Sequence, residues 1–294
     1  MIEQFRYKKF QNKNVILLEK IEEILEEFDM QGIKVTLRQL YYQLVARDIL
    51  PNKKSSYAKL SGLLTDARYN GEIDWDAIED RVRVPNIPNT FENISSLMNS
   101  AVSSYKLDRW EGQEYYVELW SEKDALSSVI IPITKNYQVP FVVNRGYTSA
   151  SSMYESAQRL LEQNKKIILF YLGDFDASGL DMDRDIKERL EEFGVELEVI
   201  RIGLTKTQIE EYSPPPNFAK DTDPRGKWFR ETYGNESWEV DALRPEILQD
   251  LIKTSILNYL DIDKFEQVKE KEQKDIKQVE EFADKLNKGD YDDK

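Results

Sequence analysis

The sequence predicts an α/β protein in which an N-terminal helical module precedes a parallel β-sheet flanked by helices. Up to residue 112 the apolar residues recur mainly at helical spacing, whereas between residues 113 and 212 short apolar runs alternate with helical segments. Strands that alternate with helices of about 10–15 residues are typical of βαβ units, whose strands are parallel. The 294 residues are enough for about two domains.

Three helices and an extended segment are predicted in the first 85 residues. The helices cover residues 14–29, 36–50 and about 56–69, and the extended segment covers residues 72–84. Thr36 is a typical N-cap, and Gly32, Pro51 and Gly71 stand where the three helices end. Two helices joined by a turn and followed by an extended segment are typical of a winged helix-turn-helix, a DNA-binding fold.

Four short apolar runs alternate with three helical segments in the second part of the chain. The strands are expected at residues 115–120, 139–144, 166–172 and 195–202, and the helices at residues 124–135, 150–164 and 180–193. A Pro-rich loop, a strand at residues 237–240 and two helices follow. We therefore expect five segments: an N-terminal helix (1–30), a winged helix-turn-helix (31–85), a helical connector (86–112), an α/β domain (113–212) and a C-terminal extension with helices (213–294).

The composition limits the chemistry, because the chain has no cysteine and no histidine. Disulfides, thiolate nucleophiles, cysteine-based metal sites and histidine bases are excluded. The 41 basic and 55 acidic residues give a net charge of −14, which argues against a protein that coats nucleic acid without specificity. No apolar run approaches the roughly 18 residues of a membrane span, and the N-terminus lacks the apolar stretch of a signal peptide. We expect no membrane partner and a cytoplasmic location.

Acidic side chains follow two strands of the predicted sheet. Glu122 comes directly after the first strand, and Asp174 and Asp176 follow the third. Ligands of open parallel sheets bind at the carboxyl ends of the strands, and alternate residues project the same way. Carboxylate oxygens suit Mg²⁺ or Mn²⁺, so the sequence predicts a metal site if these strands are neighbours. The alternative is that an Asp before a Gly serves a turn or a helix cap.

The order of these acidic residues resembles the Toprim domain, which topoisomerases, primases and some nucleases share. A strand that ends in Glu122-Lys123 is followed by a strand that ends in Asp174-x-Asp176, with Gly179 next. The resemblance covers about a third of the chain, from residue 113 to residue 212. It implies that Glu122, Asp174 and Asp176 hold a divalent metal. We count the adjacent Lys123 among the candidate catalytic residues.

A second resemblance lies on the second predicted helix. The run from Arg38 to Tyr42, Arg-Gln-Leu-Tyr-Tyr, resembles the Arg-x-x-aromatic-Tyr motif of the DNA-cleaving A subunit of topoisomerase VI and of related meiotic break-forming proteins. The resemblance implies that Tyr42 attacks a DNA phosphate, stays linked to the 5′ end, and acts at the metal site of another protomer, hence a homodimer. A phenol with a pKa of about 10 needs nearby cations, and Arg38 is a candidate. The alternative is that Tyr41 and Tyr42 only pack.

Basic side chains of the helical module are candidates for contacts with DNA phosphates. Residues 34–83 hold nine basic and seven acidic residues, a local excess in an acidic chain. The candidates for DNA binding are Lys53, Lys54, Lys59 and Arg68, with Arg81 and Arg83 in the predicted wing. The alternative is an ordinary solvated face.

Two further groups have open roles. Glu239 and Asp241 share a face if the chain is extended there. The pair would then assist a second metal or orient water. Alternatively, Asp241 caps the helix that begins at Pro245. The turn at residues 145–149 either binds a phosphate or supplies Ser149 as an N-cap.

The leading hypothesis is an enzyme that cleaves DNA with a metal-dependent Toprim domain and a tyrosine nucleophile, as a reduced topoisomerase VI A subunit. The sequence has no Walker-type Gly-rich loop, so strand passage would require a separate ATPase partner. Two alternatives stay open: a Toprim nuclease in which metal-activated water attacks, and a DNA-binding module with an inactive Toprim domain. A phosphatase that uses Asp174 and Asp176 in the manner of haloacid dehalogenases offers no role for Glu122.

Overall fold

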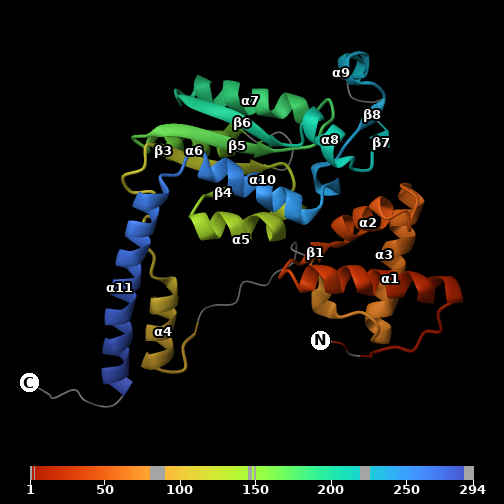
Figure 1. Cartoon of the computed structure of the whole chain (residues 1–294), viewed down its shortest axis with the longest axis horizontal. Coiled ribbons are helices and arrows are strands. Elements are labelled where there is room, and N and C mark those ends of the chain that lie inside the picture. Colours follow the sequence, from red (N-terminus) through yellow and green to blue (C-terminus); the bar gives the residue numbers. More distant parts are fainter. Residues whose placement is uncertain are drawn as a thin grey trace, which may run out of the picture.

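The computed structural model describes residues 2, 4–79, 90–144, 148, 150–218 and 226–287. This part of the chain forms a four-stranded parallel sheet with helices on both faces, next to an N-terminal helical module (Figure 1). The predicted α/β class is therefore confirmed. Arg81 and Arg83 of the expected wing lie outside the described residues, as do Ser149, residues 145–147 and the acidic C-terminal end.

The N-terminal module contains the three expected helices, α1 (Asn12–Asp29), α2 (Leu37–Ala46) and α3 (Lys54–Asn70). Thr36 is the N-cap of α2: its side chain accepts a hydrogen bond from the backbone N–H of Gln39, whose side chain accepts one from the N–H of Thr36. Gly71, with a φ of 75°, ends α3 in the left-handed conformation that favours glycine.

The extended segment expected at residues 72–84 is shorter than predicted within its described part. Only β2 (Ile78–Glu79) is a strand, and it pairs in parallel with β1 (Val35–Thr36). Residues 75–77 form a 3₁₀ turn instead, because the side chain of Asp74 accepts a hydrogen bond from the N–H of Asp76 and starts a helical turn.

The strands of the main sheet are β3 (Tyr115–Ser121), β4 (Phe141–Val143), β5 (Lys166–Leu172) and β6 (Leu197–Gly203), in the order β4-β3-β5-β6. All three strand pairs are parallel. The first and third strands along the chain are therefore neighbours, and they pair over their full length. This adjacency is the condition under which the acidic residues after the two strands meet.

Helices cover both faces of the sheet (Figure 1). α5 (Ser127–Tyr137) and α10 (Pro245–Leu257) lie on one face, and α6 (Ala150–Leu161) and α7 (Gly179–Glu192) lie on the other. Alternate residues of β5 belong to two separate apolar clusters, one on each face of the sheet. Because both faces of the strand are buried, its sequence is a continuous apolar run. The cluster on the α5 and α10 face continues without a break into the N-terminal module.

The C-terminal segments return to the sheet and to the connector. β7 (Asn217–Phe218) pairs antiparallel with β8 (Glu236–Ser237), and Trp238 forms a bridge with Phe175 in the loop after β5. The strand expected at residues 237–240 is thus a two-residue strand that leads into a 3₁₀ turn, η3 (Val240–Ala242), and η3 packs beside α2.

The remaining helices are α8 (Lys206–Tyr212), α9 (Gly226–Tyr233), α4 (Ile94–Ser104) and α11 (Ile262–Asn287). α4 belongs to the expected connector and lies along α11, so the two form a pair that extends away from the sheet (Figure 1). Among the described residues, no helix combines the length and the apolar character needed to cross a membrane.

Candidate active site

The carboxyl ends of β3 and β5 bring Glu122 and Asp174 together. The backbone N–H of Glu122 donates to the carbonyl of Leu172, which extends the strand pairing by one residue. The N–H of Asp174 in turn donates to Oε2 of Glu122 over 3.2 Å. Burial raises the pKa of both carboxyl groups, and the charge of Glu122 raises that of Asp174 further.

Asp176 lies near Asp174 and also has contacts that stabilise the start of α7. Its Oδ1 accepts hydrogen bonds from the N–H groups of Ser178 (3.0 Å) and Gly179 (2.7 Å), which begin α7. This is the cap-like role that the sequence left open. A Cβ at Gly179 would collide with the carbonyl of Asp174, so the tight loop requires glycine there. Over the described ranges, no three acidic residues are grouped closely enough to hold a metal ion by themselves.

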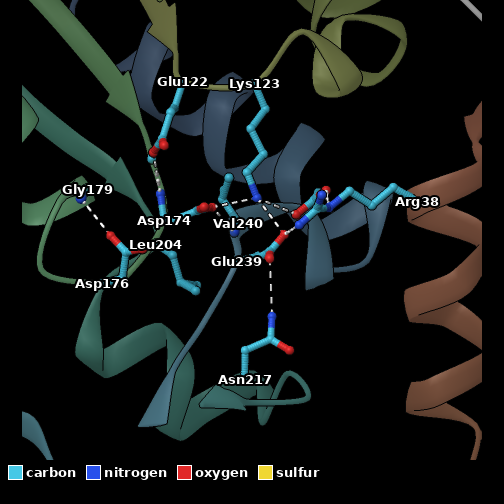
Figure 2. A network of polar contacts seen from close by, with 12 residues as sticks. Arg38, Glu122, Lys123, Asp174, Asp176, Gly179, Leu204, Asn217, Glu239 and Val240 are labelled. Atoms are coloured by element: carbon cyan, nitrogen blue, oxygen red, sulfur yellow. Dashed lines mark hydrogen bonds and ion pairs between the residues drawn. The ribbon is translucent and has the colours of Figure 1, made fainter. Parts of the chain in front are cut away.

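Lys123 lies at the centre of an acidic cluster (Figure 2). Its Nζ is 2.8 Å from Oδ1 of Asp174, from Oε2 of Glu239 and from Oδ1 of Asp241. Burial alone would lower the pKa of Lys123, but the three surrounding carboxylates outweigh it and raise the pKa. The lysine is therefore a fixed positive charge in the acidic edge of the sheet.

Arg38 links this cluster to the helical module. Its Nη2 bonds to Oε2 of Glu239, and its Nε lies 3.2 Å from Oδ2 of Asp241. The two cations outweigh burial and lower the pKa of Glu239. Asp241 is 0% exposed and does not cap α10, whose N-cap is Arg244. Of the two roles left open for Asp241, helix capping is therefore wrong.

Tyr42 is 3% exposed and lies at the module side of the same network. Its hydroxyl accepts a hydrogen bond from Nδ2 of Asn217 over 3.0 Å, and the same nitrogen donates to Oε1 of Glu239 over 3.2 Å. The guanidinium of Arg38 is 6.0 Å from the centre of the Tyr42 ring. Burial and the charge of Glu239 raise the pKa of Tyr42 to about 12, so the phenol is protonated at neutral pH.

Tyr41 has a packing role. Its hydroxyl accepts a hydrogen bond from the N–H of Lys53 over 2.8 Å, and its ring packs edge-on against Tyr57. The tyrosine thus fixes the turn between α2 and α3.

A cavity of about 610 Å³ opens where the module meets the sheet. It is lined from both sides, by Arg38, Tyr41, Tyr42, Asn52, Lys53, Lys54 and Tyr57 of the module and by Asp174, Asp176, Asn217, Ser237, Trp238 and Glu239. Tyr42, three acidic residues and two lysines therefore line one space.

The four candidate DNA-binding residues are in three different places. Lys53 and Lys54 line the cavity, whereas Lys59 lines a separate groove of about 750 Å³ together with Lys8, Lys9 and Lys13. Arg68 turns inward: its Nη2 donates to the carbonyls of Ile78 (2.8 Å) and Trp75 (3.2 Å), so it fastens the end of the module.

The sequence did not single out two residues of the site. Asn217 joins Tyr42 to Glu239, and its only signal is its position directly after three prolines. Arg201 on β6 donates to the carbonyls of Gly173 (3.1 Å), Asp174 (3.3 Å) and Gly179, and so holds the loop after β5. Its signal is a lone arginine in an apolar strand.

The fold and the site define an α/β protein with a cluster of paired charged side chains at the carboxyl edge of a parallel sheet. Comparison of the chain with protein-family models and with curated proteins gives no match.

Proposed function

We propose that the protein is a metal-dependent DNA-cleaving enzyme that combines a winged helix-turn-helix with a Toprim domain, similar to a reduced topoisomerase VI A subunit. One observation carries the proposal: Tyr42, Asp174 and Asp176 line one cavity, which Lys53 and Lys54 also line. A nucleophile, hard oxygen donors and cations for phosphates are the groups that phosphodiester cleavage needs. DNA is the partner, and a homodimer and a separate ATPase partner are predictions of the same resemblance.

The chemistry of these donors suits a divalent cation, although the described residues do not bring three of them close enough to hold it by themselves. Glu122 and Asp174 are in contact at the carboxyl edge of the sheet, where burial raises the pKa of both groups. Mg²⁺ or Mn²⁺ prefers such carboxylate oxygens, so Glu122 and Asp174 would hold it, and Asp176 would join them only if its side chain moved closer. When bound, the metal would stabilise the charge that develops on the phosphate oxygens.

The chain's own residues account for the rest of the reaction. Lys53 and Lys54 bind phosphates, and Asn217 holds the oxygen of Tyr42 at the cavity wall. In the net transfer, the Tyr42 oxygen forms a bond to phosphorus, the bond from phosphorus to the 3′ oxygen breaks, and the phenol proton ends on that 3′ oxygen. Because burial and the charge of Glu239 raise the pKa of Tyr42 to about 12, deprotonation requires an additional positive charge close to the phenol.

The decisive experiment incubates the protein with 3′-labelled DNA and Mg²⁺ and looks for protein attached to the new 5′ ends. We expect a covalent adduct that Tyr42→Phe abolishes. Tyr154→Phe is the matched control, because Tyr154 is an exposed tyrosine on α6 and loses the same hydroxyl. An adduct that survives in Tyr42→Phe contradicts the assigned nucleophile.

Hydrolysis by metal-activated water is the second candidate. The burial of Tyr42 and its raised pKa favour it, since both suit a packing role. In that case Tyr42→Phe still cleaves, and the products carry free 5′- or 3′-phosphates without protein. DNA binding without cleavage by any variant would instead indicate an inactive Toprim domain.

A further inference from the structure

The loop from Asp174 to Asp176 is held by a segment outside the part of the chain that resembles a Toprim domain. We call this segment, residues 226–240, the C-terminal strap; it comprises α9, β8 and the start of η3. The backbone N–H of Phe175 donates to the carbonyl of Trp238 over 2.7 Å, and the N–H of Trp238 donates to the carbonyl of Phe175 over 3.1 Å. The strap therefore pairs with the loop at the residue between the two acidic side chains.

Phe175 is also the centre of an aromatic cluster that the strap supplies. Its side chain is buried, and its ring centre lies 5.0 Å from that of Tyr233, 5.8 Å from that of Phe229 and 6.1 Å from that of Trp238. Edge-on aromatic pairs at such distances contribute more than their buried area alone. Neighbouring residues of an extended chain project to opposite sides, so the anchored Phe175 leaves the acidic residues on either side of it to face the cavity that they line.

The strap contacts the carboxylate of Asp174 as well. The N–H of Val240 donates to Oδ1 of Asp174 over 2.9 Å, and Figure 2 shows Val240 beside this side chain. The N–H of Asp174 donates to Glu122, while Arg201 donates to the carbonyls of the loop from β6. Asp174 is therefore fixed through both its backbone and its carboxylate, and the strap provides one of these contacts.

We propose that Phe175 and the C-terminal strap are positioning elements of the metal site, because they hold the loop in the arrangement in which Asp174 meets Glu122. This inference rests on the proposed function, which places a divalent cation at these carboxylates. A cation binds tightly only to molecules whose loop has this arrangement, so a loosened loop lowers the apparent affinity in proportion to the fraction that keeps it.

A titration with Mn²⁺ in the absence of DNA tests the inference. The signal of free Mn²⁺ in electron paramagnetic resonance measures binding to the wild type and to Phe175→Ala. We expect the Kd of Phe175→Ala to rise about tenfold or more, because fewer molecules keep the loop in place. Phe265→Ala is the matched control: it removes the same ring from a buried position on α11, and its Kd should not change. Equal Kd values for Phe175→Ala and the wild type would overturn the inference.

Hydrogen exchange without metal separates positioning from a general loss of stability. In Phe175→Ala we expect faster exchange in residues 173–179, while β5 keeps the protection that it has in the wild type. Phe265→Ala should leave the exchange of the loop unchanged. An equal acceleration in the loop and throughout the sheet would show that Phe175 acts only through overall stability, and would overturn the inference.

A second variant covers the case in which Phe175→Ala does not fold. Tyr233 is only partly buried on α9 and contacts the ring of Phe175, so Tyr233→Ala loosens the same cluster from its outer side. We expect a smaller rise in the Kd for Mn²⁺ and faster exchange in the same loop. The outcomes also separate the two proposals. A wild-type protein that binds no Mn²⁺ contradicts the proposed function, whereas binding that neither variant weakens contradicts this inference alone.

Discussion

Nζ of Lys123 lies 2.8 Å from Oδ1 of Asp241, a carboxylate with no exposed surface. Asp174 and Glu239 lie at the same distance from this ammonium group. Arg38 adds a second positive charge from the helical module. Three negative and two positive charges are thus gathered in a mostly buried space. The cluster approaches neutrality only while both cations are present, which makes it sensitive to the loss of either one.

Replacement of Lys123 is expected to destabilise the fold. Lys123→Met keeps the length of the side chain but leaves three carboxylates without their shared cation, and breaking a buried ion pair from one side costs about 3–5 kcal/mol. Thermal melting should show a clear decrease in Tm. Lys166→Met is the control, because Lys166 forms an exposed ion pair with Glu114, and its Tm should change little. Equal melting temperatures for the two variants would contradict a structural role for Lys123.

Mg²⁺ should stabilise Lys123→Met more than the wild type. A divalent cation at Glu122 and Asp174 would restore part of the missing positive charge, and a ligand that binds only the folded state raises Tm. The measurement is a thermal shift at increasing Mg²⁺, with EDTA to reverse it. Adding Asp174→Asn should remove the shift. If the wild type and Lys123→Met shift equally, Mg²⁺ does not bind beside this cluster.

The elements of the fold could be predicted where burial imposes a pattern. The strand at residues 166–172 is found as predicted, because both of its faces are buried and its apolar run is continuous. The strand expected at 139–144 is reduced to Phe141–Val143, an edge strand whose ends have a partner on one side only. Strand ends depend on neighbours that the local sequence does not specify.

The candidate site could be predicted only in part. Parallel strands bring their carboxyl ends to one edge, so the meeting of Glu122 and Asp174 follows from the order of the elements. The partners of the two cations do not follow: Arg38 and Glu239 are 201 residues apart, and Lys123 and Asp241 are 118 residues apart. Such pairs are brought together by the docking of the module on the sheet and by the turn η3. No periodic pattern in the local sequence signals either of these features.

Glu272 should make the stability of the α4 and α11 pair dependent on pH. Its carboxylate accepts hydrogen bonds from Arg109 (2.7 Å), the N–H of Leu107 (3.0 Å) and Lys106 (3.2 Å). These contacts outweigh burial and hold the pKa of Glu272 below its ordinary value. A carboxyl group whose pKa is lowered in the folded state stabilises the fold at pH values above its pKa in the unfolded chain, which is about 4.3. This contribution is lost as the pH falls through the folded-state pKa.

Denaturation of the wild type and Glu272→Gln at pH 7 and at pH 3 measures this contribution. We expect Glu272→Gln to be less stable at pH 7, and the difference to shrink at pH 3, because the carboxyl group of the unfolded chain, with a pKa of about 4.3, is protonated there. Glu270→Gln is the control, because Glu270 is exposed on the same helix. A difference that is the same at both pH values would show that Glu272 acts through packing rather than charge.

The lysine groove beside α3 should contribute to the salt dependence of DNA binding. Lys59 lines this groove with Lys8, Lys9 and Lys13, whereas Asp66 is its one acidic lining residue and pairs with Lys8. Each phosphate contact that is lost reduces the slope of log K against log salt by about 0.9. Lys13→Gln with Lys59→Gln should therefore give a shallower slope in binding titrations without metal. Lys271→Gln with Lys277→Gln removes the same charge from exposed positions on α11 and should leave the slope unchanged. Equal slopes for the two double variants would show that DNA does not contact this groove. Lys53 and Lys54 would then be the candidate phosphate contacts.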